Sequence, residues 1–192
     1  MHHRVIALST MWGIGYDERM GQLMDKARDM GFTHLELNYQ VTETMLAELR
    51  ARPGLSVSSV HSPCPGREVS GGRWTYRLRL TAEDEEEWRP ALEGALGTVD
   101  TAVALGAPVM VLHVGSVPLE DGLETRLRDL YKKREGHSSE FLEIRERLLA
   151  QREARKSLYL EAAFERVRRI VDYASDRGVM VGLESRYYFH EI

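Results

Sequence analysis

Residues 106–113 read Gly-Ala-Pro-Val-Met-Val-Leu-His, and this stretch decides the fold class because it joins a glycine to a short apolar run that closes on a polar side chain. Glycine is favoured just after a helix, where the backbone often turns left-handed and a side chain is costly. The same join occurs at residues 31–37, 54–61 and 178–184. With the apolar run at 5–9, the chain has five expected strands. Most are continuously apolar, as strands of a parallel sheet are when both faces are buried.

Helical patterns fill the gaps between these runs. The first gap shows an apolar stripe at helical spacing, formed by Met20, Leu23, Met24, Ala27 and Met30. Strands that alternate with helices indicate βαβ units, which form either a barrel or an open doubly wound sheet. An open nucleotide-binding sheet carries a glycine-rich phosphate loop after its first strand, whereas residues 9–16 hold only Gly13 and Gly15. We therefore predict an α/β fold, a parallel (β/α) TIM-type barrel forming one domain over residues 1–192.

Two stretches break the regular alternation. Residues 62–80, rich in glycine, proline and arginine, are expected to form an irregular loop. Residues 114–157, after the fourth strand, form a charged insertion with helical patterns over 123–134 and 139–155. The insertion is either a helical hairpin exposed to solvent or a lid, since the βα loops of a barrel lie over its active-site face.

The charge balance and the single cysteine limit the classes of protein. The 26 basic and 30 acidic residues give a net charge of −4, which argues against a dedicated nucleic-acid-binding protein. No stretch approaches the ~18 apolar residues that a membrane span needs, so we expect no membrane partner. Cys64 has no second cysteine with which to form an internal disulfide. A reducing compartment, the cytoplasm, is therefore the expected location.

Four polar side chains stand at or near the ends of the apolar runs: Glu36, His61, His113 and Glu184. All strand carboxyl ends of a barrel point to the same mouth, so these side chains are expected to converge on one pocket. Imidazole and carboxylate are the usual protein ligands of zinc, manganese and related ions. Each residue also has a structural alternative, either a hydrogen-bonded histidine or, for Glu36, an ion-pair partner. A carboxylate that ends a buried strand, as Glu184 does, is costly unless it is paired or binds a metal, so function is favoured there.

Four short motifs resemble those of the xylose isomerase-like barrel superfamily, which holds sugar and sugar-phosphate isomerases and epimerases together with zinc AP endonucleases. Three are Phe-Thr-His-Leu-Glu-Leu at 32–37, Val-His-Ser-Pro at 60–63 and Val-Leu-His-Val-Gly at 111–115. The fourth and most specific, Gly-Leu-Glu-Ser-Arg-Tyr-Tyr-Phe-His-Glu-Ile at 182–192, is similar to the family's Leu-Glu-Asn-Arg segment, with Ser185 in place of asparagine. The motifs cover the whole chain but only about five of the eight strands of such a barrel.

The resemblance implies a divalent metal ion, Mn, Mg, Co or Zn, with Glu184 as its first carboxylate ligand. In the isomerases and epimerases the metal holds substrate oxygens while glutamates move a proton beside the carbonyl, so Glu184 is also the expected catalytic residue. In the endonuclease branch the residues that match His61, His113 and Glu184 all bind zinc. By the same resemblance, the expected substrate contacts are Glu36, His61, His113, Arg186 and Glu191. The family's remaining ligands lie on later strands that have no counterpart in this sequence.

The first function hypothesis is a metal-dependent isomerase or epimerase of a small sugar, sugar phosphate or related polyhydroxy compound. The alternatives are a zinc-dependent AP-endonuclease-like phosphodiesterase, supported by the arginine and aromatic residues at 66–79, and a non-catalytic truncated barrel that acts as a binding module. A full barrel takes ~250 residues and eight strands. We therefore expect either a longer natural protein or a homo-oligomer in which two chains cover each other's open side, and no isomerase activity from the isolated monomer.

Overall fold

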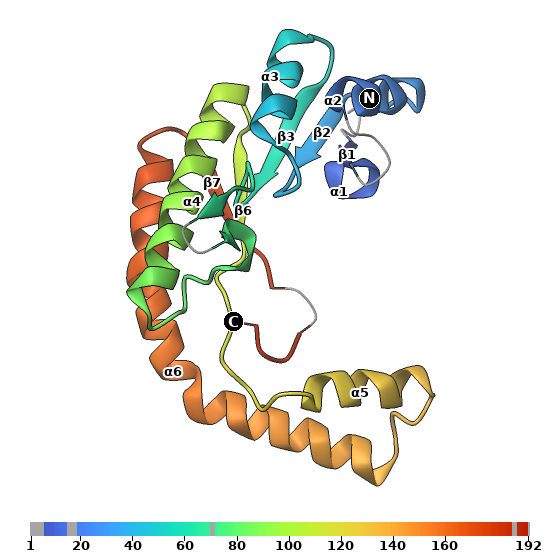
Figure 1. The fold of residues 1–192 in the computed structure, drawn as a ribbon, viewed down its shortest axis with the longest axis vertical. Helices are drawn as coiled ribbons and strands as arrows, with labels where there is room; N and C mark the ends of the chain where they lie inside the picture. The colour runs from blue at the N-terminus through green and yellow to red at the C-terminus, as the bar shows by residue number, and fades with distance from the viewer. Residues whose placement is uncertain (1–5, 15–18, 70–71, 186–187, 192) are drawn as a thin grey trace, which may run out of the picture.

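The computed structural model describes residues 6–14, 19–69, 72–185 and 188–191, and its centre is a five-stranded parallel sheet (Figure 1). The strands, in order across the sheet, are β1 (Ala7–Ser9), β2 (His34–Leu37), β3 (Ser56–His61), β6 (Val109–Leu112) and β7 (Met180–Leu183). Their order in the sheet follows their order in the chain, as in a barrel wall. In a doubly wound sheet the order reverses at a switch point. The predicted fold class, an incomplete parallel barrel, is confirmed.

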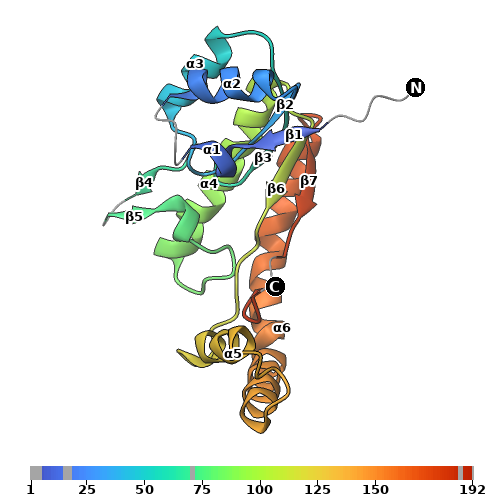
Figure 2. The same ribbon diagram turned by 90° about the vertical axis from the view of Figure 1, so that its right-hand side faces the viewer.

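Helices cover one face of this sheet. α2 (Met20–Asp29), α3 (Glu43–Ala51), α4 (Glu85–Leu105) and α6 (Ser139–Ser175) follow one another along that face, while the short α1 (Thr10–Gly13) follows β1 directly (Figures 1 and 2). Gly106, just after α4, has the left-handed φ of 66° that the sequence predicts for a helix-ending glycine. No helix among the described residues is long and apolar enough to cross a membrane.

The main core lies between the sheet and these helices. The stripe predicted on the first helix is buried, since Met20, Leu23, Met24 and Ala27 have no exposed surface. Met30 is exposed instead, because α2 ends at Asp29 and the chain turns away. Buried apolar surface is worth roughly 25 cal/mol per Å². This interface therefore holds the helices on the sheet.

The 62–80 stretch is more regular than the sequence predicts. β4 (Glu68–Val69) and β5 (Arg73–Trp74) form a small antiparallel sheet, and the 3₁₀ helix η1 (Thr75–Arg77) follows. Gly66 lets this loop approach the end of β2, because a Cβ atom there would overlap the carbonyl oxygen of Tyr39. Asp84 then caps α4 by accepting a hydrogen bond from the Glu86 amide. The loop is thereby held beside the carboxyl ends of the strands.

Beyond β6 the chain forms a hairpin of α5 (Leu123–Lys132) and the first half of α6. These helices begin where the sequence predicts, at Leu123 and Ser139. α6 then continues to Ser175, because no glycine or proline interrupts 139–175. A separate apolar cluster, consisting of Leu127, Leu130, Ile144 and Leu148, packs the two helices together. The hairpin projects beyond the carboxyl ends of β6 and β7 (Figure 1).

Candidate active site

The sheet register brings polar side chains from three neighbouring strands close together. Leu112 of β6 pairs with Leu183 of β7, so the residues that follow them, His113 and Glu184, lie side by side. His61, the last residue of β3, pairs with Val111 of β6. Ligand atoms of His61, His113 and Glu184 all lie within 4.8 Å of one another. The structure therefore gathers the three residues that the sequence suggests as metal ligands.

Glu36 sets the orientation of the His61 ring. It lies within β2, opposite Ser59, and its Oε2 atom is 3.2 Å from Nε2 of His61 and 3.1 Å from the Ser59 hydroxyl, which donates to it. The hydrogen bond from His61 lowers the pKa of Glu36 to about 2, and the same hydrogen bond raises the pKa of His61. Nδ1 of His61 is left to face Glu184, 3.7 Å from its Oε2 atom. A metal ion at Nδ1 would compete with the proton that Glu36 favours.

The backbone fixes the ring of His113. Its Nδ1 atom is 3.0 Å from the carbonyl oxygen of Glu184. Since a carbonyl oxygen only accepts, Nδ1 carries the proton. In the neutral ring Nε2 then keeps its lone pair, and it lies 3.6 Å from Oε2 of Glu184. Metal-binding histidines usually donate their second ring nitrogen to a carboxylate or carbonyl. Both His61 and His113 are arranged in this way.

The three side chains line a cavity of about 470 Å³, within the size range of small-molecule sites. On another wall the rings of Tyr39 and Tyr76 lie with their centroids 4.5 Å apart. Arg79 also lines the cavity, and two hydrogen bonds to the Glu87 carboxylate hold it there. The cavity therefore combines a metal-ligand cluster with aromatic and cationic walls.

The remaining predicted substrate contacts lie in different places. Glu191 lines the cavity and is only 8% exposed. Glu36 stands behind His61, one step deeper in the sheet than the strand ends, and does not belong to the cavity lining. Arg186 lies outside the described residues. Glu36 is thus positioned as a partner of His61.

Residues 24–189 match the sequence pattern of the family described as xylose isomerase-like TIM barrel. The chain belongs to this family. No curated protein sequence matches the chain.

Several solved structures resemble this chain along almost its whole length. A D-tagatose 3-epimerase-like protein is 20% identical, with a TM-score of 0.59, and the match covers 97% of this chain and 54% of that one. A 3-keto-D-glucoside 4-epimerase from E. coli is 13% identical, with a TM-score of 0.59, and the match covers 98% of this chain and 59% of that one. A Thermus thermophilus protein soaked with zinc chloride is 18% identical, with a TM-score of 0.52, and the match covers 94% of this chain and 55% of that one. Such identities show the fold, and the chain spans about half the length of these structures.

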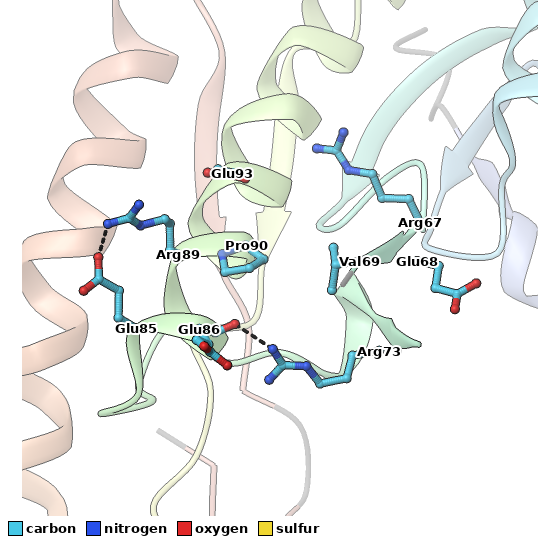
Figure 3. A pocket seen from close by; sticks show the side chains of 9 residues that line it. All are labelled: Arg67, Glu68, Val69, Arg73, Glu85, Glu86, Arg89, Pro90 and Glu93. Atoms are coloured by element: carbon cyan, nitrogen blue, oxygen red, sulfur yellow. Dashed lines mark hydrogen bonds and ion pairs between the residues drawn. The ribbon is translucent and has the colours of Figure 1, made fainter. Parts of the chain in front are cut away.

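A larger cavity of this barrel chain, about 1040 Å³, lies between the β4–β5 hairpin and α4 (Figure 3). Its arginines and glutamates largely offset one another. Arg89 pairs with Glu85, and Arg73 donates to the Glu86 carbonyl at 2.9 Å. Among the described residues, the cluster of histidines and glutamate lies in the smaller cavity, which is therefore the candidate active site.

Two residues that the sequence did not single out form a further contact at the edge of the smaller cavity. His190 lines it, and Glu124 of α5 binds His190. His190 adjoins Glu191 in the most family-like segment, so its position in the sequence offered a signal. Glu124 offered none, because it lies in the insertion, 66 positions away from His190.

Proposed function

We propose that this chain carries the substrate- and metal-binding face of a metal-dependent isomerase or epimerase. The substrate would be a small sugar, sugar phosphate or related polyhydroxy compound, and the reaction a proton transfer next to its carbonyl. The observation that supports this most is the cluster of His61, His113 and Glu184, with ligand atoms within 4.8 Å, on the wall of a cavity at the strand ends. Similar solved structures carry the names of sugar epimerases.

The donor set suits a divalent ion of the zinc, manganese or cobalt kind. Two imidazole nitrogens and one carboxylate converge, and Glu36 and the Glu184 carbonyl orient the two rings. An ion held by His61, His113 and Glu184 would polarise a substrate carbonyl. Glu184, the carboxylate nearest that position, is the residue we assign to proton transfer beside the carbonyl.

Deuterium incorporation tests this proposal without knowledge of the product. The chain would be incubated in D₂O with Mn²⁺, Co²⁺ or Zn²⁺ and a panel of ketohexoses, pentoses and their phosphates. Metal-dependent exchange at the carbon beside the carbonyl, without conversion to an isomer and abolished in Glu184→Gln, is the expected result, because exchange needs one base whereas isomerisation needs the second carboxylate that this chain lacks. Without exchange on any compound by the metal-loaded chain, the isomerase proposal fails for these 192 residues.

A zinc phosphodiesterase is the second candidate, and the two histidines in the three-ligand set favour it. One similar structure comes from a protein soaked with zinc chloride. Metal analysis separates the candidates, since the isomerase needs one ion and the endonuclease type up to three. Cleavage of a duplex with an abasic site would favour the phosphodiesterase. Retained metal or sugar binding without either activity would favour a non-catalytic binding module.

A cytoplasmic location also belongs to the proposal. It rests on the single cysteine, Cys64, which has no second cysteine with which to form an internal disulfide. Cys64 is 1% exposed, and burial raises the pKa of its thiol to about 12, so the reactive thiolate is scarce at neutral pH.

A further inference from the structure

The segment after β7 carries a second polar centre into the cavity. His190 lines the cavity, and its Nδ1 atom lies 2.6 Å from Oε2 of Glu124, on α5 of the hairpin. Neither residue belongs to the metal-ligand cluster. A carboxylate bound to one nitrogen of a histidine whose ring borders a cavity is the arrangement by which proteins orient an imidazole toward a ligand.

Glu124 is itself held by several groups. Its Oε1 atom accepts from the Phe189 amide at 3.1 Å and from Arg128 at 3.1 Å, and its side chain is 17% exposed. Burial acts to raise the pKa of Glu124, but the hydrogen bonds from His190 and the Phe189 amide outweigh it and lower the pKa. The carboxylate is therefore ionised at neutral pH and remains a strong acceptor for His190.

The contact determines which ring nitrogen is available. An ionised carboxylate only accepts, so Nδ1 of His190 carries a proton. Nε2 is then the nitrogen left to meet a molecule in the cavity, and in the neutral ring it is a hydrogen-bond acceptor.

The backbone around His190 is fastened from three sides. The Val117 amide donates to the His190 carbonyl at 2.7 Å, and Arg152 of α6 donates to the Glu191 carbonyl at 3.2 Å. Phe189 packs on the apolar cluster of the hairpin. The α5–α6 hairpin thus sets the place of His190, beyond merely covering it.

We propose that Glu124 is a positioning residue that holds His190 with Nδ1 protonated, so that Nε2 accepts a hydrogen bond from a substrate hydroxyl at the part of the cavity wall formed by His190 and Glu191. This inference rests on the proposed function, because it takes the ligand to be a polyhydroxy compound. It adds a second contact for such a ligand, apart from the cluster of His61, His113 and Glu184.

The test has a structural arm and a binding arm. In the structural arm, the full chain with ¹⁵N-labelled histidines is studied by long-range ¹H–¹⁵N NMR, and His190 is assigned from its loss in His190→Asn. We expect a protonated Nδ1 and an unprotonated Nε2 in the neutral ring, and a changed ring spectrum in Glu124→Gln. Glu140→Gln is the matched control, because Glu140 pairs with Arg126 across the same hairpin.

In the binding arm, D-fructose and D-xylose are titrated into the zinc-loaded chain. Asparagine at 190 keeps a donor near the Nδ1 position but has no atom at Nε2. We therefore expect His190→Asn to weaken sugar binding about tenfold, and Glu124→Gln similarly. Zinc affinity should stay within about twofold of the wild type, because the ligand cluster is separate.

The outcomes are distinguishable. A neutral His190 protonated at Nε2, or a ring spectrum unaffected by Glu124→Gln, overturns the inference whatever the sugars do. The same holds if His190→Asn binds the sugars as well as the wild type. If the wild type binds neither sugar while His190 has the expected tautomer, the sugar-binding role of His190 fails and the positioning by Glu124 stands, while the deuterium-exchange test on the wider panel decides the proposed function.

Discussion

Glu36 and His61 form a half-buried ion pair whose strength depends on pH. The pKa of Glu36 is lowered from 4.5 to about 2, so its contribution to stability is present above pH 4.5 and is lost as the pH falls through about 2. The pKa of His61 is raised above 6.5, so its contribution is present below pH 6.5 and is lost as the pH rises through the raised value. The pair stabilises the metal-free fold most between these limits, from pH 4.5 to 6.5.

Glu36→Gln should therefore destabilise the metal-free chain more at pH 5.5 than at pH 8.5. Urea unfolding at the two pH values in the presence of EDTA measures the difference. Glu87→Gln is the matched control, because its partner Arg79 stays charged throughout and the loss should be the same at both pH values. An equal loss at both pH values in Glu36→Gln would contradict the ion pair.

Glu184 supplies the carboxylate of the candidate metal cluster. Glu184→Gln should lower the affinity for Zn²⁺ or Mn²⁺ by at least about tenfold and leave the circular dichroism spectrum unchanged, because an amide is a poorer ligand of similar shape. Competition with a chelator measures the affinity, with Glu161→Gln on the exposed face of α6 as the control. Unchanged metal affinity in Glu184→Gln would remove it from the site.

Much of the candidate site follows from residues that end strands. His61, His113 and Glu184 were predictable as neighbours, because parallel strands bring their carboxyl ends to one edge of the sheet. Glu36 was predicted to contact the substrate, but it lies behind His61. The sequence alone does not show at which residue a strand ends, and the register places Glu36 within β2, opposite Ser59. The Glu124–His190 contact was not predictable, because nothing in the local pattern of either segment indicates the other.

At the scale of elements, the hairpin of α5 and α6 has its own small core. The prediction of strands and helix starts succeeded because glycines end most helices and apolar runs mark the strands. The short β4–β5 pair was missed, because two-residue strands carry no periodicity. The length of α6 was missed because the insertion and the helix before β7 join without a breaking residue.

Leu148 and Leu149 offer a matched pair for testing the hairpin. Leu148 is fully buried in the hairpin cluster, whereas its neighbour Leu149 is 40% exposed. Leu148→Ala should cost about 2–5 kcal/mol of local stability, and Leu149→Ala much less. Hydrogen exchange should then show α5 and the Phe189 amide opening in Leu148→Ala while β6 stays protected. Equal loss of protection in β6 would mean that the hairpin and the sheet unfold as one unit.

At the scale of the whole molecule, the sheet formed by the described residues ends at β1 on one side and at β7 on the other. In β7, the side chains of Met180 and Leu183 are 64% and 62% exposed. α6 continues this apolar face.

One side of α6 packs against α4, where the Tyr173 hydroxyl donates to Asp100 and the Arg166 guanidinium lies over the Trp88 ring. Helical spacing puts Leu160, Phe164 and Val171 on the flank away from α4, and all three are exposed. In a parallel barrel this flank is where the next strand and helix pack.

An apolar face of this kind beside unpaired backbone groups favours association. We predict that the isolated 192-residue chain associates with a second copy through β7 and the Leu160–Phe164–Val171 flank of α6. Phe164→Lys should weaken that association, because Phe164 is 73% exposed and a buried lysine charge opposes dimer formation. Tyr131→Lys is the matched control, since Tyr131 is equally exposed, at 72%, but lies on the hairpin, far along the chain from this flank. Sedimentation velocity over a hundredfold concentration range measures both variants. A wild-type chain that remains monomeric at the highest concentration would contradict the prediction. So would an association that Tyr131→Lys disrupts and Phe164→Lys does not, because the surface in contact would then be the hairpin.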